Sequence, residues 1–112
     1  MSRGDAKRLN DIRRMCAAAA DLTARGRGAA DRDEALWFAL ERIIEIAGEA
    51  ATQLSDECRG VYRDVPWREL MGVRVVLAHG YHRVDRDLLW AIASTELPVI
   101  ADALGPIEVA ES

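Results

Sequence analysis

The residues best suited to chemistry stand together in one short stretch, where Arg74, His79 and Tyr81 fall within about eight positions. A guanidinium binds a phosphate through charge and paired hydrogen bonds, an imidazole moves protons near neutral pH, and a phenol supplies a hydroxyl group. These three side-chain types in one place point to work on phosphodiesters.

The element that must position them is a helix that starts near Pro66 and ends at Gly80, since proline favours a first turn and glycine a C-terminal stop. On such a helix Arg74 and His79 point about 140° apart and cannot form a tight pair. A site therefore needs the arginine to bend along the surface, the helix to end early, or a second copy of the chain to supply matching residues across a two-fold axis.

The remaining pattern is also helical. A first helix is expected from about Asp5 to Ala24, before a glycine-rich loop, and a second from Ala35 to Leu54, started by Asp31 with Glu34 three residues later. The second helix has one continuous apolar face. That face consists of Leu36, Leu40, Ile43, Ile44, Ala47, Ala50, Ala51 and Leu54.

A fourth helix should follow Asp85 as N-cap, with Val84 and Leu89 forming a hydrophobic staple and Pro98 kinking or splitting it. No alternating strand pattern is present. The sequence thus predicts an all-α fold, an antiparallel up-and-down bundle of four main helices, as one domain over residues 1–112 with a tail that frays after about residue 105.

Composition supports a single globular domain, with 50% hydrophobic and 30% charged residues in 112. The apolar runs are too short to cross a bilayer, so we expect a cytoplasmic protein with no membrane partner. Cys16 and Cys58 are too far apart in sequence for a metal knuckle or redox pair and are expected to be reduced structural thiols. His79, His82 and Asp85 make a weak ligand set, so no metal site is predicted.

Charge is unevenly spread. The chain carries a net charge of −4, yet residues 59–86 hold an excess of arginines, including Arg83. A functional basic island and a plain bias toward arginine explain this equally well, since Lys7 is the only lysine. Glu41, Glu45 and Glu49 form a like-charged stripe on the second helix, for which contact with arginines of a neighbouring helix or with a second subunit is favoured over plain solvation.

The motif carries a family resemblance. Arg74-x4-His79-x-Tyr81, preceded by the segment PWRELMG at 66–72 and followed by Val84-Asp85, resembles the HepT-like branch of the HEPN superfamily. The segment ERIIEIAGEA at 41–50 resembles that branch's other typical segment. The likeness therefore spans most of the chain.

This resemblance implies an all-α, HEPN-like homodimer that is the toxin of a type VII-like toxin–antitoxin pair. It implies a metal-independent endoribonuclease acting on RNA without a cofactor, with its site where two motif helices meet. Arg74 and His79 would be catalytic. The partner would be an MntA-like nucleotidyltransferase antitoxin, which in some pairs adds AMP to the motif tyrosine, here Tyr81, a residue that could also contact substrate. The candidate supporting residues are His82, Glu49 and Arg83.

One position departs from the family pattern. Members commonly place Asn or Asp after the motif arginine, where this chain has Val75, which can neither orient the arginine nor hydrogen-bond to a substrate. The alternative function is therefore a catalytically silent HEPN-like module that pairs with a nucleotidyltransferase or binds RNA or nucleotide without cleavage.

Overall fold

The computed structural model describes residues 1–79 and 85–108, with the side chains of residues 74–76, 78 and 79 left out of the description. Within these residues the chain is helical and has no strand, which confirms the all-α class. The short helices α2 and α4 were not predicted. The elements are α1 (Arg3–Thr23), α2 (Arg27–Asp31), α3 (Glu34–Thr52), α4 (Asp56–Val61), α5 (Trp67–His79), α6 (Arg86–Ala91), η1 (Ile92–Glu96) and α7 (Leu97–Leu104).

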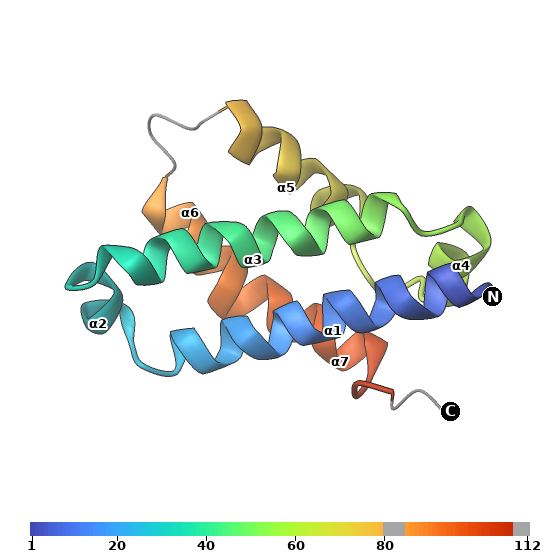
Figure 1. Cartoon of the computed structure of the whole chain (residues 1–112), viewed down its shortest axis with the longest axis horizontal. Helices are drawn as coiled ribbons and strands as arrows, with labels where there is room; N and C mark the ends of the chain where they lie inside the picture. Colours follow the sequence, from blue (N-terminus) through green and yellow to red (C-terminus); the bar gives the residue numbers. More distant parts are fainter. Residues whose placement is uncertain (80–84, 109–112) are drawn as a thin grey trace.

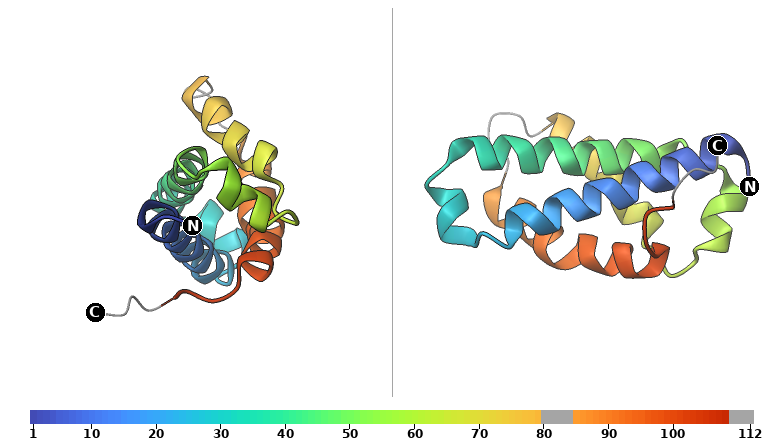
Figure 2. Two further views of the ribbon diagram at one scale, coloured as in Figure 1. Left: turned by 90° about the vertical axis from the view of Figure 1, so that its right-hand side faces the viewer. Right: turned by 60° about the horizontal axis from the view of Figure 1, so that its bottom comes forward.

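The long helices pack around α3. Helices α1 and α3 run side by side in opposite directions, and α7 and η1 pack against α1 (Figure 1). Helix α5 lies against α3 on the side away from α7, so it forms the outer edge of the bundle (Figure 2). The bundle is therefore uneven, because α1 is covered by several elements and α5 mainly by one.

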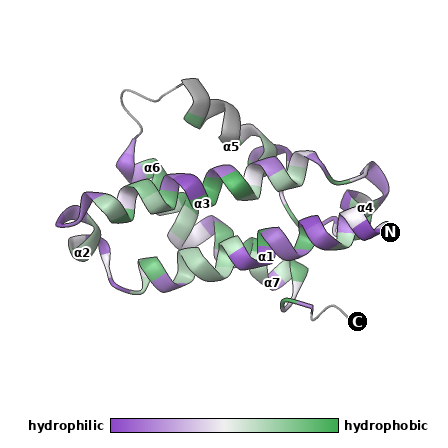
Figure 3. Cartoon of the chain, viewed as in Figure 1, coloured by the Kyte–Doolittle hydropathy of each residue, from purple (hydrophilic) through white to green (hydrophobic). Residues whose placement is uncertain are grey.

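Every position of the apolar face expected on α3 is buried. Apolar and polar residues alternate along this helix (Figure 3), as expected for a helix with one buried and one exposed side. Small residues let neighbouring helices approach closely, because Ala47 and Ala51 present little more than a methyl group. Helix α1 contributes Leu9, Ile12, Cys16 and Ala19 to the same core, and α7 contributes Leu97 and Ile100.

The caps define where the helices begin. The Asp85 side chain accepts hydrogen bonds from the backbone N–H groups of Asp87 and Leu88, which confirms it as the N-cap of α6. The N-cap residue predicted for α3 was wrong by two positions. Asp33, not Asp31, is the N-cap and accepts from Ala35 N at 3.1 Å, because Asp31 already ends the short helix α2.

A π-helical turn, η1, separates α6 from α7 immediately before Pro98. The Leu97 N–H donates to the Ile92 carbonyl, five residues back, which is the π pattern. Proline has no N–H, and its ring collides with the carbonyl of the preceding turn in a regular helix. The π turn, which is wider than an α turn, lies at the place where the Pro98 ring would otherwise collide with a backbone carbonyl.

Buried Asp5 joins the beginnings of α1 and α4. Its carboxylate accepts hydrogen bonds from Ser55 N at 2.9 Å and Ser55 Oγ at 2.7 Å, and its backbone N–H donates to Ser2 Oγ in a capping box. Hydrogen bonds from the backbone and the hydroxyl of Ser55 lower the pKa of Asp5 against the effect of burial. The hydrogen bonds from Ser55 therefore favour the ionised form of the Asp5 carboxylate.

Buried Arg13 joins α1 to the end of α7. Only 5% of the residue is exposed, and its Nη2 donates to the Leu104 carbonyl at 2.8 Å while Nη1 donates to Asn10 Oδ1 at 3.0 Å. The carbonyl end of a helix carries partial negative charge, which favours a guanidinium there. The same Asn10 side chain exchanges two hydrogen bonds with the backbone of Glu108, so the described part of the tail is tied to α1.

No helix among the described residues combines the length and the apolar character that crossing a bilayer requires.

Asp5→Asn is expected to lower the free energy of unfolding at neutral pH, because the amide cannot accept the same charge-assisted hydrogen bonds. Because the folded-state pKa of Asp5 is depressed, its contribution is fully present above the ordinary value of 3.8 and is lost as the pH falls through the folded pKa. The difference between wild type and variant, measured by urea unfolding from pH 7 to pH 2.5, should therefore shrink below about pH 4. The exposed Asp102→Asn is the control, and an equal pH-dependent difference there would contradict the assignment.

Arg13→Met is expected to lower the free energy of unfolding by roughly 1–3 kcal/mol, since it leaves the buried Leu104 carbonyl without its donor. The matched control is Arg14→Met, which removes a neighbouring exposed arginine that pairs with Asp11 at 3.6 Å. That change should cost less than about 1 kcal/mol. Equal losses in the two variants, measured by chemical denaturation, would show that the Leu104 contact is unimportant.

Candidate functional site

The candidate site is carried by α5, whose first turn is anchored by Trp67. The indole Nε1 donates to the carbonyls of Arg59 at 3.0 Å and Tyr62 at 2.9 Å, and the ring is buried. A buried indole whose N–H is hydrogen-bonded has one favoured orientation, and it therefore fixes the backbone that carries it. The start of α5 is therefore fixed against the turn that follows α4.

Arg59 connects this corner to α3. Its Nη1 donates to the carbonyls of Ala51 at 3.0 Å and Leu54 at 2.8 Å, and its Nη2 pairs with Asp56. The last carbonyls of a helix have no partner within the helix, so a guanidinium there satisfies them. Helix α4 thus joins the end of α3 to the beginning of α5.

Helix α5 then runs along α3 with Leu70 buried and Met71, Val73 and Leu77 partly buried against the core. It remains helical through Arg74 and Val75 to His79. The sequence left three ways in which Arg74 and His79 could share one site: a bent arginine, an early end of the helix, or a second copy of the chain. The continuous helix excludes the early end. A regular helix keeps Arg74 and His79 about 140° apart around its axis. Tyr81, His82 and Arg83 lie outside the described residues, as does Val84 of the predicted staple.

Glu49 lies on the exposed side of α3. Its carboxylate accepts from Gln53 Nε2 at 3.2 Å. Glu45 of the same stripe pairs with Arg42 at 2.9 Å, an arginine of its own helix rather than of a neighbouring one. Arg8 of α1 lines a groove of about 220 Å³ together with Glu45 and Glu49. An arginine of the neighbouring helix α1 thus lines one groove together with two members of the stripe.

Sequence reasoning missed a polar cluster at the start of α6. Arg27 of α2 and Arg86 of α6 both lie against the ring of Trp37, which is only 2% exposed and also packs against Trp90 with the ring centroids 6.1 Å apart. The available signal was that Trp37 lies off the main apolar face of α3, which indicated more than one packing partner. Phe38 beside it is 60% exposed.

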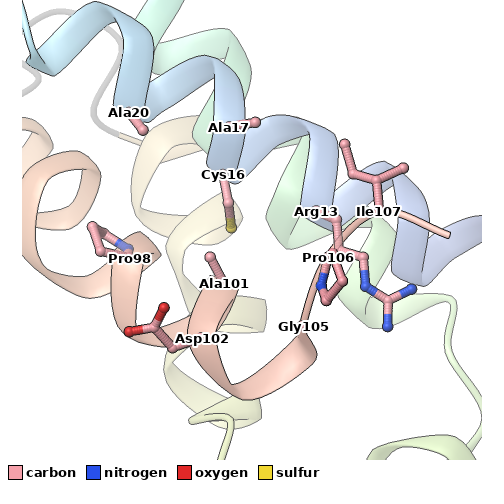
Figure 4. A pocket seen from close by; sticks show the side chains of 10 residues that line it. All are labelled: Arg13, Cys16, Ala17, Ala20, Pro98, Ala101, Asp102, Gly105, Pro106 and Ile107. Carbon is pink, nitrogen blue, oxygen red and sulfur yellow. The ribbon is translucent and has the colours of Figure 1, made fainter.

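A larger groove, of about 550 Å³, lies elsewhere, between α1, α7 and the tail. Cys16 points its sulfur toward Ala101 across this groove, while the Arg13 guanidinium points away from it (Figure 4). Burial raises the pKa of the Cys16 thiol to about 11, so at neutral pH it is a poor nucleophile. Cys58 is likewise a buried free thiol. The elements that line this groove, α1, α7 and the tail, lie on the side of the bundle away from α5 (Figure 2), so the groove does not belong to the candidate site.

Acidic, histidine and cysteine side chains do not gather into a metal-binding group of three anywhere in the described part of the chain.

Comparison with known families identifies the family of the chain that carries the Arg74 and His79 motif on α5. A family model described as ribonuclease HepT-like matches residues 9–107, a range that includes all of α5 and Tyr81. The chain belongs to the HepT-like ribonuclease family of the HEPN superfamily. The match confirms the family that was predicted from the motif at Arg74, His79 and Tyr81.

Individual relatives agree. The protein named "Putative RNase MJ1380" of Methanocaldococcus jannaschii is 38% identical over 63 residues, which make up 56% of this chain and 58% of that protein. The "Probable ribonuclease HepT" of Thermococcus cleftensis is 33% identical over 66 residues, or 59% of this chain and 60% of that protein. Each match thus covers less than two thirds of the relative. No solved structure matches the HepT-like chain significantly.

Proposed function

We propose that this HepT-like protein is a metal-independent endoribonuclease, active as a homodimer. The observation that carries the proposal is the family match, which spans the motif helix with Arg74 and His79. The phosphodiester chemistry inferred from the residue types agrees with it.

The helical geometry supports a dimer. Arg74 and His79 lie on different sides of an unbroken helix, so neither can complete the other within one chain without a long detour of the arginine. Helix α5 packs mainly on α3 and forms the outer edge of the bundle, where a second copy has access to it. A two-fold axis beside α5 would bring one chain's Arg74 and the partner's motif helix to the same phosphate.

Cleavage would proceed by transfer to the 2′-oxygen. One His79 takes the proton from the 2′-hydroxyl, the 2′-oxygen forms a bond to phosphorus, and the bond from phosphorus to the 5′-oxygen breaks. The His79 of the second copy donates a proton to that leaving oxygen. Arg74 stabilises the charge that gathers on the phosphorane oxygens. The products carry a 2′,3′-cyclic phosphate and a 5′-hydroxyl.

Purified protein is expected to cleave RNA in the presence of a chelator, and His79→Ala should lower the cleavage rate by about 10²–10⁴-fold, as loss of a general acid or base does. Arg74→Ala should lower it by a similar order through loss of charge stabilisation. Gel analysis of end-labelled RNA measures both the rate and the cyclic phosphate.

The matched control is Arg68→Ala, which removes an exposed arginine from the first turn of the same helix and should leave the rate unchanged. An RNA with a single 2′-deoxy nucleotide at the cut site should resist cleavage. Equal residual cleavage in the Arg74, His79 and Arg68 variants would refute the proposal.

We further propose that the protein is the toxin of a type VII-like pair and that a MntA-like nucleotidyltransferase neutralises it by adding AMP to Tyr81. In that step the Tyr81 oxygen attacks the α-phosphorus of ATP, pyrophosphate leaves, and the phenolic proton goes to solvent. His82, Arg83 and Glu49 are proposed as supporting residues of the site.

Incubation with an MntA-like nucleotidyltransferase and ATP is expected to add one AMP, detected by mass spectrometry, and to abolish cleavage. The chain has two tyrosines, which makes a clean comparison. Tyr81→Phe should remain unmodified, whereas Tyr62→Phe should still be modified, since Tyr62 is partly buried beside Trp67. Modification of the Tyr81→Phe variant would contradict the assignment.

Val75 favours a second candidate, a catalytically silent module that binds a nucleotidyltransferase, RNA or nucleotide. It occupies the position after Arg74 within the unbroken α5, and its side chain has no hydrogen-bonding atom. This function predicts a stable complex with the partner and no RNA cleavage by the wild-type protein, so the same cleavage assay separates the two candidates.

A further inference from the structure

Two arginines from different helices share one buried tryptophan at the end of the bundle. The Cζ atoms of Arg27 and Arg86 lie 5.0 Å and 5.2 Å from the centroid of the Trp37 ring, within the range of cation–π attraction. Arg27 Nη1 also donates to Asp87 Oδ1 at 2.8 Å. We name Arg27, Trp37, Arg86 and Asp87 the α6 clamp, because they hold α2, α3 and the first turn of α6 together.

An indole is the side chain best suited to this clamp. The Nε1–H of Trp37 is buried and has no acceptor among the described residues. A phenylalanine would avoid that unsatisfied donor at this buried position. What the indole adds is the strongest cation-binding face of any side chain, which suits a ring that two guanidinium groups share.

The arginines of the clamp are already paired with carboxylates. Arg27 Nε donates to Asp31 Oδ1 at 3.2 Å in addition to its bond with Asp87, and Arg86 lies 3.9 Å from Glu34. A phosphate would have to displace these acids from a region rich in negative charge. The clamp is therefore suited to holding protein elements together rather than to binding RNA.

Its place along the chain connects it to the motif helix. Arg86 is the first residue of α6, and only residues 80–84 stand between His79, the last residue of α5, and the N-cap Asp85. Six backbone steps reach at most about 20 Å. Trp67 anchors the beginning of α5 and α3 supports its side as far as Leu77, and the short connection to α6 adds a restraint on the end that bears His79.

We propose that the α6 clamp positions the catalytic end of α5, with Arg27, Trp37 and Asp87 as positioning residues. The clamp fixes the start of α6 on α3 and so limits where His79 can lie. This inference rests on the proposed ribonuclease function. A displacement of about 1 Å at a catalytic group can lower a rate a hundredfold, so an exposed ion pair remote from the chemistry can matter.

A double-mutant cycle of Arg27→Gln and Asp87→Asn tests the pair. Each single change is expected to lower kcat for RNA cleavage by about tenfold or more, with KM within about twofold, because the substrate is bound but His79 is misplaced. The double variant should be no worse than either single variant, since the two groups act as one unit. The melting temperature of Asp87→Asn should change little, because exposed ion pairs add little stability, whereas Arg27→Gln also loses the contact with the Trp37 ring.

The matched control is the cycle of Arg42→Gln and Glu45→Gln, an exposed ion pair of similar length, 2.9 Å, on α3. It should leave kcat unchanged. An equal fall in kcat in both cycles, a rise in KM alone, or additive losses in the clamp cycle would overturn the inference.

Amide hydrogen exchange supplies a readout that does not need RNA. Arg27→Gln and Asp87→Asn should each speed exchange in the peptide that contains residues 77–79 and in the first turn of α6, while exchange in α1 stays as in wild type. If the wild-type protein fails to cleave RNA, the proposed function falls, and faster exchange still supports the clamp. Unchanged exchange at residues 77–79 would overturn the clamp even in an active enzyme.

Discussion

The burial of α3 is the constraint on which the rest of the structure depends. This helix contacts α1 on one side and α5 on another, and α2, α6 and η1 also pack against it. Its small and apolar residues are buried nearly all round, whereas Phe38, Arg42, Glu45 and Glu49 remain exposed along one strip. Because burial of apolar area is the main favourable term in folding, the other elements take their positions from this helix.

The exposed edge of the bundle follows from the same arrangement. Helix α1 is covered by α3, η1 and α7, but α5 has α3 as its main support. A helix with one packed side has surface left for another molecule. In this protein that helix carries Arg74 and His79, the residues proposed for catalysis, and its open side is the surface that the proposed dimer would use.

Polar contacts at the helix ends hold the bundle in register. Asp5 binds Ser55, Arg13 binds the Leu104 carbonyl, and Arg59 binds the last carbonyls of α3. In each case a charged side chain satisfies backbone groups that would otherwise lack partners at a helix end or corner. Such groups are costly to bury unpaired, and so these contacts favour one arrangement of the helices over others.

The sequence by itself determined the long helices and the family. The period of the apolar residues predicted the buried face of α3, Asp85 was recognisable as an N-cap, and the motif at Arg74, His79 and Tyr81 indicated a HepT-like chain. All of these signals are local, because periodicity, capping and motif spacing depend on residues within a few turns of one another.

Only the tertiary structure decided which side chains meet across the bundle. Asp5 and Ser55 are separated by 50 positions, and Arg13 and Leu104 by 91, so no local pattern could pair them. The same holds for Arg86 on the ring of Trp37, and for α5 at the edge of the bundle. These features arise from packing between distant segments, in which partner choice depends on the whole set of buried surfaces rather than on any one stretch of residues.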